Sequence, residues 1–76
     1  MNLIIDAGNT AVKLAVFEEG QLILTQHVGA VYQDFKAISE EYPKINSVLI
    51  CDVRGLDWDF LNRIFDSKNI FKTASS

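Results

Sequence analysis

The chain has 76 residues, of which 49% are hydrophobic and 22% charged, a composition typical of a globular domain and not of a disordered segment. With 7 Lys and Arg against 10 Asp and Glu, its formal net charge is -3, so we expect no nucleic-acid partner. A chain of this length forms one domain at most and buries only about 60% of the surface that its unfolded form exposes, which predicts marginal stability.

The compartment follows from the cysteine count and the apolar runs. Cys51 is the single cysteine, and no cluster of Cys and His offers the ligands of a structural zinc. The first apolar run ends at Asp6, too early for the core of a signal peptide, and no stretch approaches the roughly 20 apolar residues of a membrane span. We therefore expect a cytoplasmic location and no membrane partner.

The first part of the chain predicts three strands in an antiparallel meander. Residues 3–5 form a short aliphatic run that stops at the turn-forming residues 6–9. Residues 10–17 read as a strand that is apolar on both faces except at Lys13, and after the turn at 18–21 residues 22–28 form the third strand. The connections are short enough that consecutive strands must pair.

The middle of the chain predicts an amphipathic helix. Val31, Phe35, Ile38 and Tyr42 follow one another at spacings of four, three and four, which is the apolar stripe of a helix. Pro43 ends it.

The remainder predicts a strand, a helix and the start of a further strand. Residues 47–53 lack polar alternation, as expected of a strand covered on both faces, and they follow the helix as the second strand of a parallel crossover would. Asp57 is expected to cap a second helix. The apolar stripe of that helix consists of Phe60, Leu61, Ile64 and Phe65. Residues 70–72 look like the beginning of a fifth strand.

This order, β-β-β-α-β-α with a possible fifth β, predicts an α/β ribonuclease-H-like half-domain with a mixed sheet of strand order 3-2-1-4(-5). The end of the chain at residues 73–76 is interpreted as a truncation. Residues 1–76 would then be an amino-terminal ATPase half-domain whose second domain is absent.

The turn after the first strand has the residues of an anion site. Asp6 lies where the sheet opens, and Gly8 lets a ligand approach the backbone closely. Asn9 tolerates a positive φ and Thr10 brings a hydroxyl, so the turn can form a nest of N–H donors for phosphate.

Lys13 is a cation within an apolar strand, and a buried ammonium requires a counter-charge. It lies beyond the residues expected directly opposite Asp6 and would reach along the sheet, so that lysine, aspartate and a phosphate-bound magnesium share one site. The alternative is structural: Asp6 caps the turn, and Lys13 extends to the sheet edge in an ion pair that holds no ligand.

The opening of the chain resembles that of type III pantothenate kinases, whose first phosphate motif is Asp-x-Gly-Asn-Thr-x-x-Lys. The motif matches at Asp6, Gly8, Asn9, Thr10 and Lys13. The resemblance implies catalytic roles for Asp6 and Lys13, with Asp6 as the magnesium ligand and all five residues binding MgATP. It also implies ATP, Mg²⁺ and a monovalent cation (K⁺ or NH₄⁺) as cofactors, and pantothenate as the substrate phosphorylated on the way to coenzyme A.

The family's second phosphate motif, Asp-x-Gly-Thr, and its Gly-x-Asp-Arg segment do not occur in these residues. We therefore expect the chain alone to be inactive, and to self-associate or form a homodimer because one sheet face lacks a cover. Two alternatives stay open. One is a non-catalytic nucleotide-binding or protein-interaction module, and the other is a different phosphotransferase of the sugar-kinase superfamily.

Other polar and aromatic residues have functional and structural interpretations. Asp52 is either a second carboxylate facing the cleft or, as we favour, a cap on the following turn. His27 is expected to be an edge-strand polar group and Cys51 a buried inert thiol. Trp58 could stack a base, but core packing or a subunit contact is favoured. Arg54 either touches phosphate or makes a loop salt bridge, the simpler account.

Overall fold

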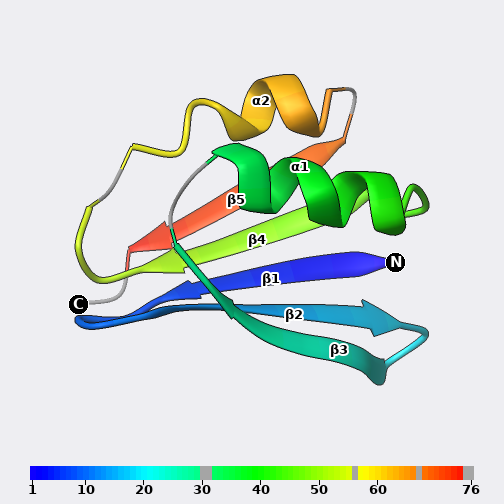
Figure 1. The fold of residues 1–76 in the computed structure, drawn as a ribbon, viewed down its shortest axis with the longest axis horizontal. Coiled ribbons are helices and arrows are strands. Elements are labelled where there is room, and N and C mark those ends of the chain that lie inside the picture. The colour runs from blue at the N-terminus through cyan, green and yellow to red at the C-terminus, as the bar shows by residue number, and fades with distance from the viewer. Residues whose placement is uncertain (30–31, 56, 67, 75–76) are drawn as a thin grey trace.

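The computed structural model describes residues 1–29, 32–55, 57–66 and 68–74, so Val31 and residues 75–76, on which two expectations fall, lie outside it. Figure 1 shows the elements along the chain. They are β1 (Asn2–Ala7), β2 (Val12–Glu18), β3 (Gln21–Val28), α1 (Tyr32–Glu41), β4 (Ser47–Asp52), α2 (Leu61–Ile64) and β5 (Asn69–Ala74). Neither helix, as far as the described residues go, has the length and apolarity needed to cross a membrane.

The five strands form one mixed sheet of order β3-β2-β1-β4-β5. β1 and β3 run antiparallel to β2, while β4 lies parallel to β1 and β5 parallel to β4 (Figure 1). The predicted fold class and strand order are confirmed, including the fifth strand.

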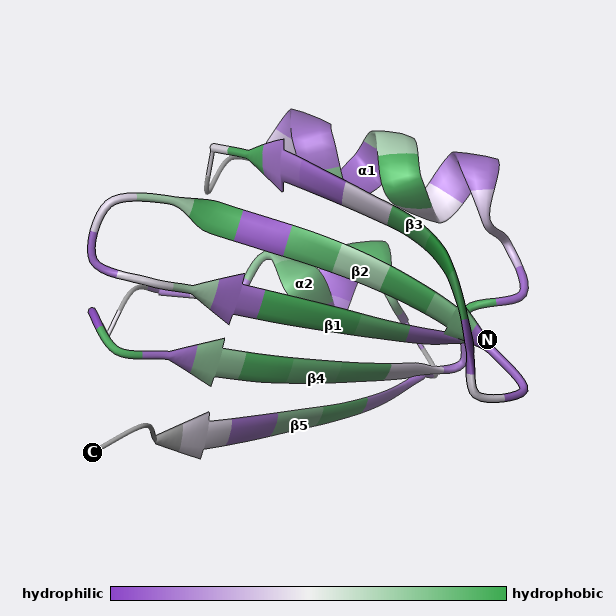
Figure 2. Ribbon diagram, turned by 90° about the horizontal axis from the view of Figure 1, so that it is seen from below, coloured by the Kyte–Doolittle hydropathy of each residue, from purple (hydrophilic) through white to green (hydrophobic). Residues whose placement is uncertain are grey.

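Both helices cover the same face of the sheet. Seen from below in Figure 2, the strands lie in front and the helices behind. Alternate strand residues point toward the helices and are fully or almost fully buried; they are Leu3, Ile5, Ala7, Val12, Leu14, Val16, Val48 and Ile50. They pack with Phe35 and Ile38 of α1 and Leu61 of α2 in one core. We call this side the helix-covered face.

The opposite side, which carries Ile4, Asp6, Leu49 and Cys51, is the helix-free face. The expectation that residues 47–53 are covered on both faces is wrong for the described part of the chain. Leu49 and Cys51 are only half-buried, because no described helix packs on their side. The apolar run in β4 therefore predicted the strand correctly but not its surroundings.

The β2–β3 connection is a turn of two residues, Glu19 and Gly20. Glu19 and Gly20 both have positive φ, 51° and 79°. Two consecutive left-handed residues give the turn a twist that matches the twist of the strands on either side.

The two helices differ in how well local sequence rules predict them. In α1, Phe35 and Ile38 are buried as the stripe predicts, and the helix ends at Glu41, before Pro43. The expected helix cap at Asp57 is wrong. Its Oδ1 accepts the Asp59 N–H (2.9 Å), and α2 begins only at Leu61, with no side-chain cap.

The reason lies in Trp58, which is 5% exposed and bound through its indole nitrogen. Anchoring this side chain in the core holds residues 57–60 in a turn, which delays the helix. The predicted apolar stripe nevertheless holds, since Leu61 and Phe65 are buried and Phe60 and Ile64 are half-buried.

Candidate phosphate-binding site

The candidate site lies at the carboxyl-terminal end of β1 and in the loop that follows it. Asp6 is on the helix-free face and exposed, as are the side chains of Asn9 and Thr10 in the loop. The Gly8 N–H donates to the Ala11 carbonyl (2.9 Å), which closes the loop. Three polar side chains are thus accessible within five residues of each other, at the end of a strand.

The loop differs in one respect from the expected nest of N–H donors. Positive φ among the described residues occurs at Glu19, Gly20 and Gly55, so Asn9 does not adopt the left-handed conformation that it tolerates. The Gly8 N–H is also already used within the loop. Asn9 and Thr10 offer further donors for a phosphate, from backbone and side chain.

The backbone of the loop does not itself require glycine at position 8. A Cβ there would lie 3.6 Å from the Ala11 carbonyl oxygen, which is an ordinary contact, and the φ of Gly8 is not positive. Since the loop itself would tolerate a side chain at position 8, the glycine is better explained by close approach of a ligand to the backbone, as proposed from the sequence.

Lys13 is directly opposite Asp6 in the β1–β2 register. Directly opposed residues of an antiparallel pair share a face, with their Cβ atoms about 4.5–5.5 Å apart. The expectations that Lys13 is buried and that it must reach along the sheet are both wrong. Its side chain is exposed, because β2 turns Lys13 to the helix-free face and Val12 and Leu14 to the core. The two charged groups are brought together more simply than predicted.

A row of polar side chains extends from this pair across all five strands. In register, His27 is opposite Lys13, Lys13 opposite Asp6, Asp6 beside Cys51, and Cys51 beside Thr73. Thr73 Oγ1 lies 3.5 Å from Cys51 Sγ and donates to the Ile50 carbonyl (3.3 Å). His27 is an exposed residue of an edge strand, as expected, whereas Cys51 is half-buried and not the fully buried thiol predicted.

The row was missed by sequence reasoning, which treated His27, Cys51 and Thr73 separately or not at all. The signal that could have found it is the pairing register. Once Asp6 is placed opposite Lys13, strand alternation puts the other members on the same face.

Asp52, the other candidate carboxylate, faces the helix-covered side. It is 6% exposed, and its oxygens accept hydrogen bonds from the Arg54 N–H (2.7 Å) and from Trp58 Nε1–H (2.7 Å). The favoured interpretation, a cap on the turn after β4, is confirmed, and Asp52 does not join the row. The bond to Trp58 has no sequence signal other than the burial expected of an indole near a strand end.

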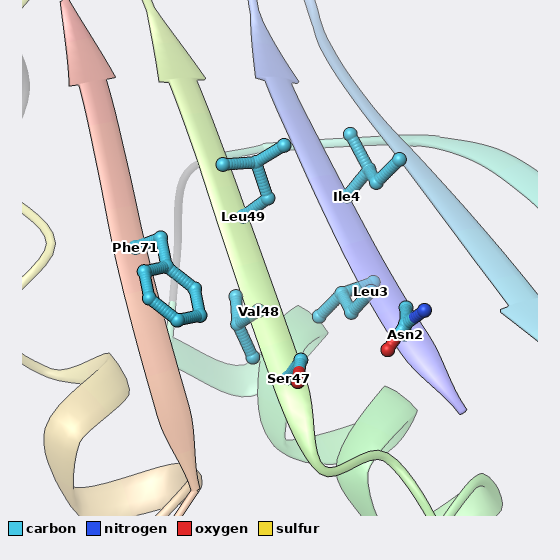
Figure 3. A pocket seen from close by; sticks show the side chains of 7 residues that line it. All are labelled: Asn2, Leu3, Ile4, Ser47, Val48, Leu49 and Phe71. Atoms are coloured by element: carbon cyan, nitrogen blue, oxygen red, sulfur yellow. The ribbon is translucent and has the colours of Figure 1, made fainter.

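A hollow on the helix-free face lies away from these residues. Figure 3 shows it between β1, β4 and β5, with a volume of about 290 Å³. It is lined by Asn2, Leu3, Ile4, Ser47, Val48, Leu49 and Phe71. With no charged lining residue and a position toward the amino-terminal ends of β1 and β4, the hollow is unsuited to phosphate.

Comparison with known proteins connects this geometry to a class of enzyme. The chain is 31% identical over 74 residues to a type III pantothenate kinase from Christiangramia forsetii, a match that covers 95% of the chain and 30% of that relative. The resemblance to type III pantothenate kinases is confirmed. The chain spans about a third of the length of the proteins it matches.

The fold has a close counterpart among solved structures. A Porphyromonas gingivalis protein described as an N-acetylglucosamine kinase superposes with a TM-score of 0.72, over 97% of this chain and 34% of that one, at 16% identity. At this identity the likeness shows the fold alone. No family model matches the chain.

Magnesium fits the site only together with phosphate. Among the described residues, no group of three or more His, Cys, Asp and Glu side chains is arranged to hold a metal ion. Mg²⁺ commonly binds through one or two carboxylates, with substrate phosphates and water completing its shell. A single exposed carboxylate, Asp6, beside a phosphate loop suits that mode and does not suit a site made of protein ligands alone.

Proposed function

We propose that this chain is the phosphate-binding, amino-terminal part of an ATP-dependent kinase that phosphorylates pantothenate, the first step towards coenzyme A. Residues 1–76 would be its first ribonuclease-H-like ATPase half-domain. One observation carries the proposal: Asp6 and Lys13 oppose each other on an exposed sheet face, directly beside the loop that presents Asn9 and Thr10. The sequence resemblance supplies the choice of pantothenate.

In this proposal each residue of the motif has a distinct task. Lys13 would donate to an oxygen of the transferring phosphoryl group, and Asn9 and Thr10 would hold the neighbouring phosphate oxygens. Asp6 would ligate the magnesium ion, which supplies positive charge to the phosphates when MgATP is bound. Positioning and electrostatic stabilisation provide most of the rate of phosphoryl transfer, so accessible, correctly placed charges are the contribution expected of this half-domain.

The rest of the proposal concerns the chain as a unit. The second phosphate motif and the Gly-x-Asp-Arg segment are not in these residues, so the chain alone should bind MgATP without phosphorylating pantothenate. We also propose a cytoplasmic location, a requirement for K⁺ or NH₄⁺ in the whole enzyme, and homodimerisation or self-association.

Amide NMR of this 8.5 kDa chain tests the binding step directly. MgATP should shift the amide signals of Asn9, Thr10 and Lys13, and leave those of α2 unchanged. Asp6→Asn should abolish the shifts, whereas Asp59→Asn, an exposed aspartate in the turn before α2, should retain them. Shifts centred on the hollow of Figure 3, or no shifts with the wild-type chain, would contradict the proposal.

A second candidate function is a protein-interaction module, and a set of exposed large apolar side chains favours it. Leu22, Ile23 and Phe71 are 54%, 45% and 57% exposed. Saturable self-association without any MgATP binding would favour this candidate over the kinase.

A third candidate is another phosphotransferase of the sugar-kinase superfamily, in keeping with the shared fold. Assays of a longer polypeptide containing this chain, with pantothenate and N-acetylglucosamine compared as acceptors, distinguish it from the pantothenate kinase.

A further inference from the structure

The exit from β4 is a second structured loop at the same edge of the sheet as the phosphate loop. Asp52, the last residue of β4, accepts the Arg54 N–H and the Trp58 indole N–H, each at 2.7 Å. Gly55 follows with a φ of +69°, a left-handed conformation that an L side chain rarely adopts. The chain is therefore held in one sharp turn immediately after Arg54.

This turn is anchored on both of its sides. On one side, the Val53 N–H donates to the Ala7 carbonyl (3.1 Å), extending the parallel β1–β4 pairing by one residue. On the other side, Trp58 is 5% exposed and packs edge-on against Phe35 of α1, with ring centroids 5.7 Å apart. After β4, Val53 is thus fixed to the end of β1 and Trp58 to the core.

These anchors place Arg54 next to the candidate site. Val53 is bonded to Ala7, which precedes Gly8, so the loop of Arg54 and the phosphate loop leave the sheet from neighbouring backbone positions. Arg54 is exposed, and within the described part of the chain no ion pair involves it. The loop salt bridge that was the simpler account of this arginine from the sequence is not formed there.

The guanidinium group is the side chain best suited to two oxygens of one phosphate, since its fixed fork of N–H donors matches their spacing. We propose that Arg54 is a phosphate-contacting residue of the site, and that Asp52 and Trp58 are positioning residues that hold its loop at the end of β1. This inference rests on the proposed function, because the ligand is the same MgATP. It adds a second strand end, that of β4, to a site otherwise built from β1 and β2.

The direct test is calorimetric titration of the chain with MgATP. Arg54→Gln should weaken binding about tenfold or more, the effect of losing a charged hydrogen-bond donor. Arg54→Lys should recover part of the loss, because it restores the charge without the fork. The matched control is Arg63→Gln, which changes an exposed arginine in α2. This helix leads to the amino-terminal end of β5, where the Asn69 N–H donates to the Asn46 carbonyl. The control variant should bind as the wild-type chain does.

The positioning role is tested by a double-mutant cycle. Trp58→Phe keeps an aromatic ring but removes the N–H that Asp52 accepts. In the wild-type background it should weaken MgATP binding several-fold, and in the Arg54→Gln background it should add no further loss, because it acts through Arg54. An equal loss in both backgrounds would show that Trp58 acts on stability alone and would overturn its positioning role.

The outcomes separate this inference from the function on which it rests. If Asp6→Asn abolishes MgATP binding while Arg54→Gln binds as tightly as wild type, the assignment of Arg54 is overturned and the proposed function stands. If the wild-type chain does not bind MgATP, both are overturned. The expected result is that Asp6→Asn and Arg54→Gln both weaken MgATP binding, whereas Arg63→Gln and Asp59→Asn bind as the wild-type chain does.

Discussion

Two aspartates lie near the carboxyl-terminal ends of neighbouring parallel strands of this sheet, and their surroundings are opposite. Asp6 of β1 is level with Cys51 of β4, while Asp52 is level with Ala7, so the two carboxylates are offset by one residue. An offset of one residue reverses the face of a side chain. Asp52 is therefore buried and bonded to Trp58, and Asp6 is exposed beside Lys13.

This difference separates a structural role from a ligand-binding role for the same residue type. Burial of Asp52 uses its oxygens on donors of the chain itself, which fixes the loop after β4. The exposed carboxylate of Asp6 is left accessible to a cation and phosphate from solution. Each aspartate has its role because of the face of the sheet on which it lies, and not because of its residue type.

Replacing each aspartate by alanine should give the largest contrast. Asp52→Ala leaves the Trp58 and Arg54 N–H groups without their acceptor in a buried site, and should lower the free energy of unfolding by about 3 kcal/mol. Asp6→Ala changes an exposed side chain and should alter it by no more than about 0.5 kcal/mol. Urea unfolding followed by circular dichroism measures both, and similar losses for the two would mean that the assigned roles are not distinct.

A smaller change at the buried aspartate isolates one hydrogen bond. Trp58→Phe should cost about 1 kcal/mol, since the ring stays against Phe35 and only the N–H donor is lost. Trp58→Ala, which also removes the packing, should cost about 3–5 kcal/mol. If Trp58→Phe proves as damaging as Trp58→Ala in urea unfolding, the hydrogen bond to Asp52 is the main contribution of this residue.

A substitution of an exposed apolar residue on the helix-free face should change self-association but not the free energy of unfolding. Phe71→Ser removes the most exposed large apolar side chain among the described residues, and should weaken self-association while changing the unfolding free energy by about 0.5 kcal/mol or less. Sedimentation velocity at several protein concentrations measures the effect. Tyr32→Ser, at an exposed position on α1, is the control and should associate as the wild-type chain does. Unchanged association in Phe71→Ser would place the contact elsewhere.

Local sequence patterns predicted the order of the elements because each run and turn is complete within a few residues. The strand order followed from short connections and from the parallel crossover. The side of the sheet that stays open was not predictable in this way. Residues 10–17 and 47–53 are apolar at most positions, so nothing local says that Lys13 and Cys51 face away from the helices.

The grouping of the candidate residues was predicted better than the contacts that hold the neighbouring loop. The motif brought Asp6, Asn9, Thr10 and Lys13 together by residue type, and the structure places them at one edge of the sheet. The bond from Trp58 to Asp52 depends on the path of the loop between them, for which no periodicity exists. The same bond explains why Asp57 failed as a helix cap, since burial of the indole outweighed a local preference.

The central proposal is that Asp6 would serve the chemistry of a pantothenate kinase. The most direct test is ATP-dependent phosphorylation of pantothenate by a polypeptide that contains this chain and extends to the length of its relatives, compared with its Asp6→Asn and Asp59→Asn variants. The account predicts turnover in the wild-type and Asp59→Asn proteins and a loss of at least about a hundredfold with Asp6→Asn, as expected when a positioned charge is removed from a transition state. Full activity in Asp6→Asn, or no phosphorylation of pantothenate by the wild-type protein, would contradict it.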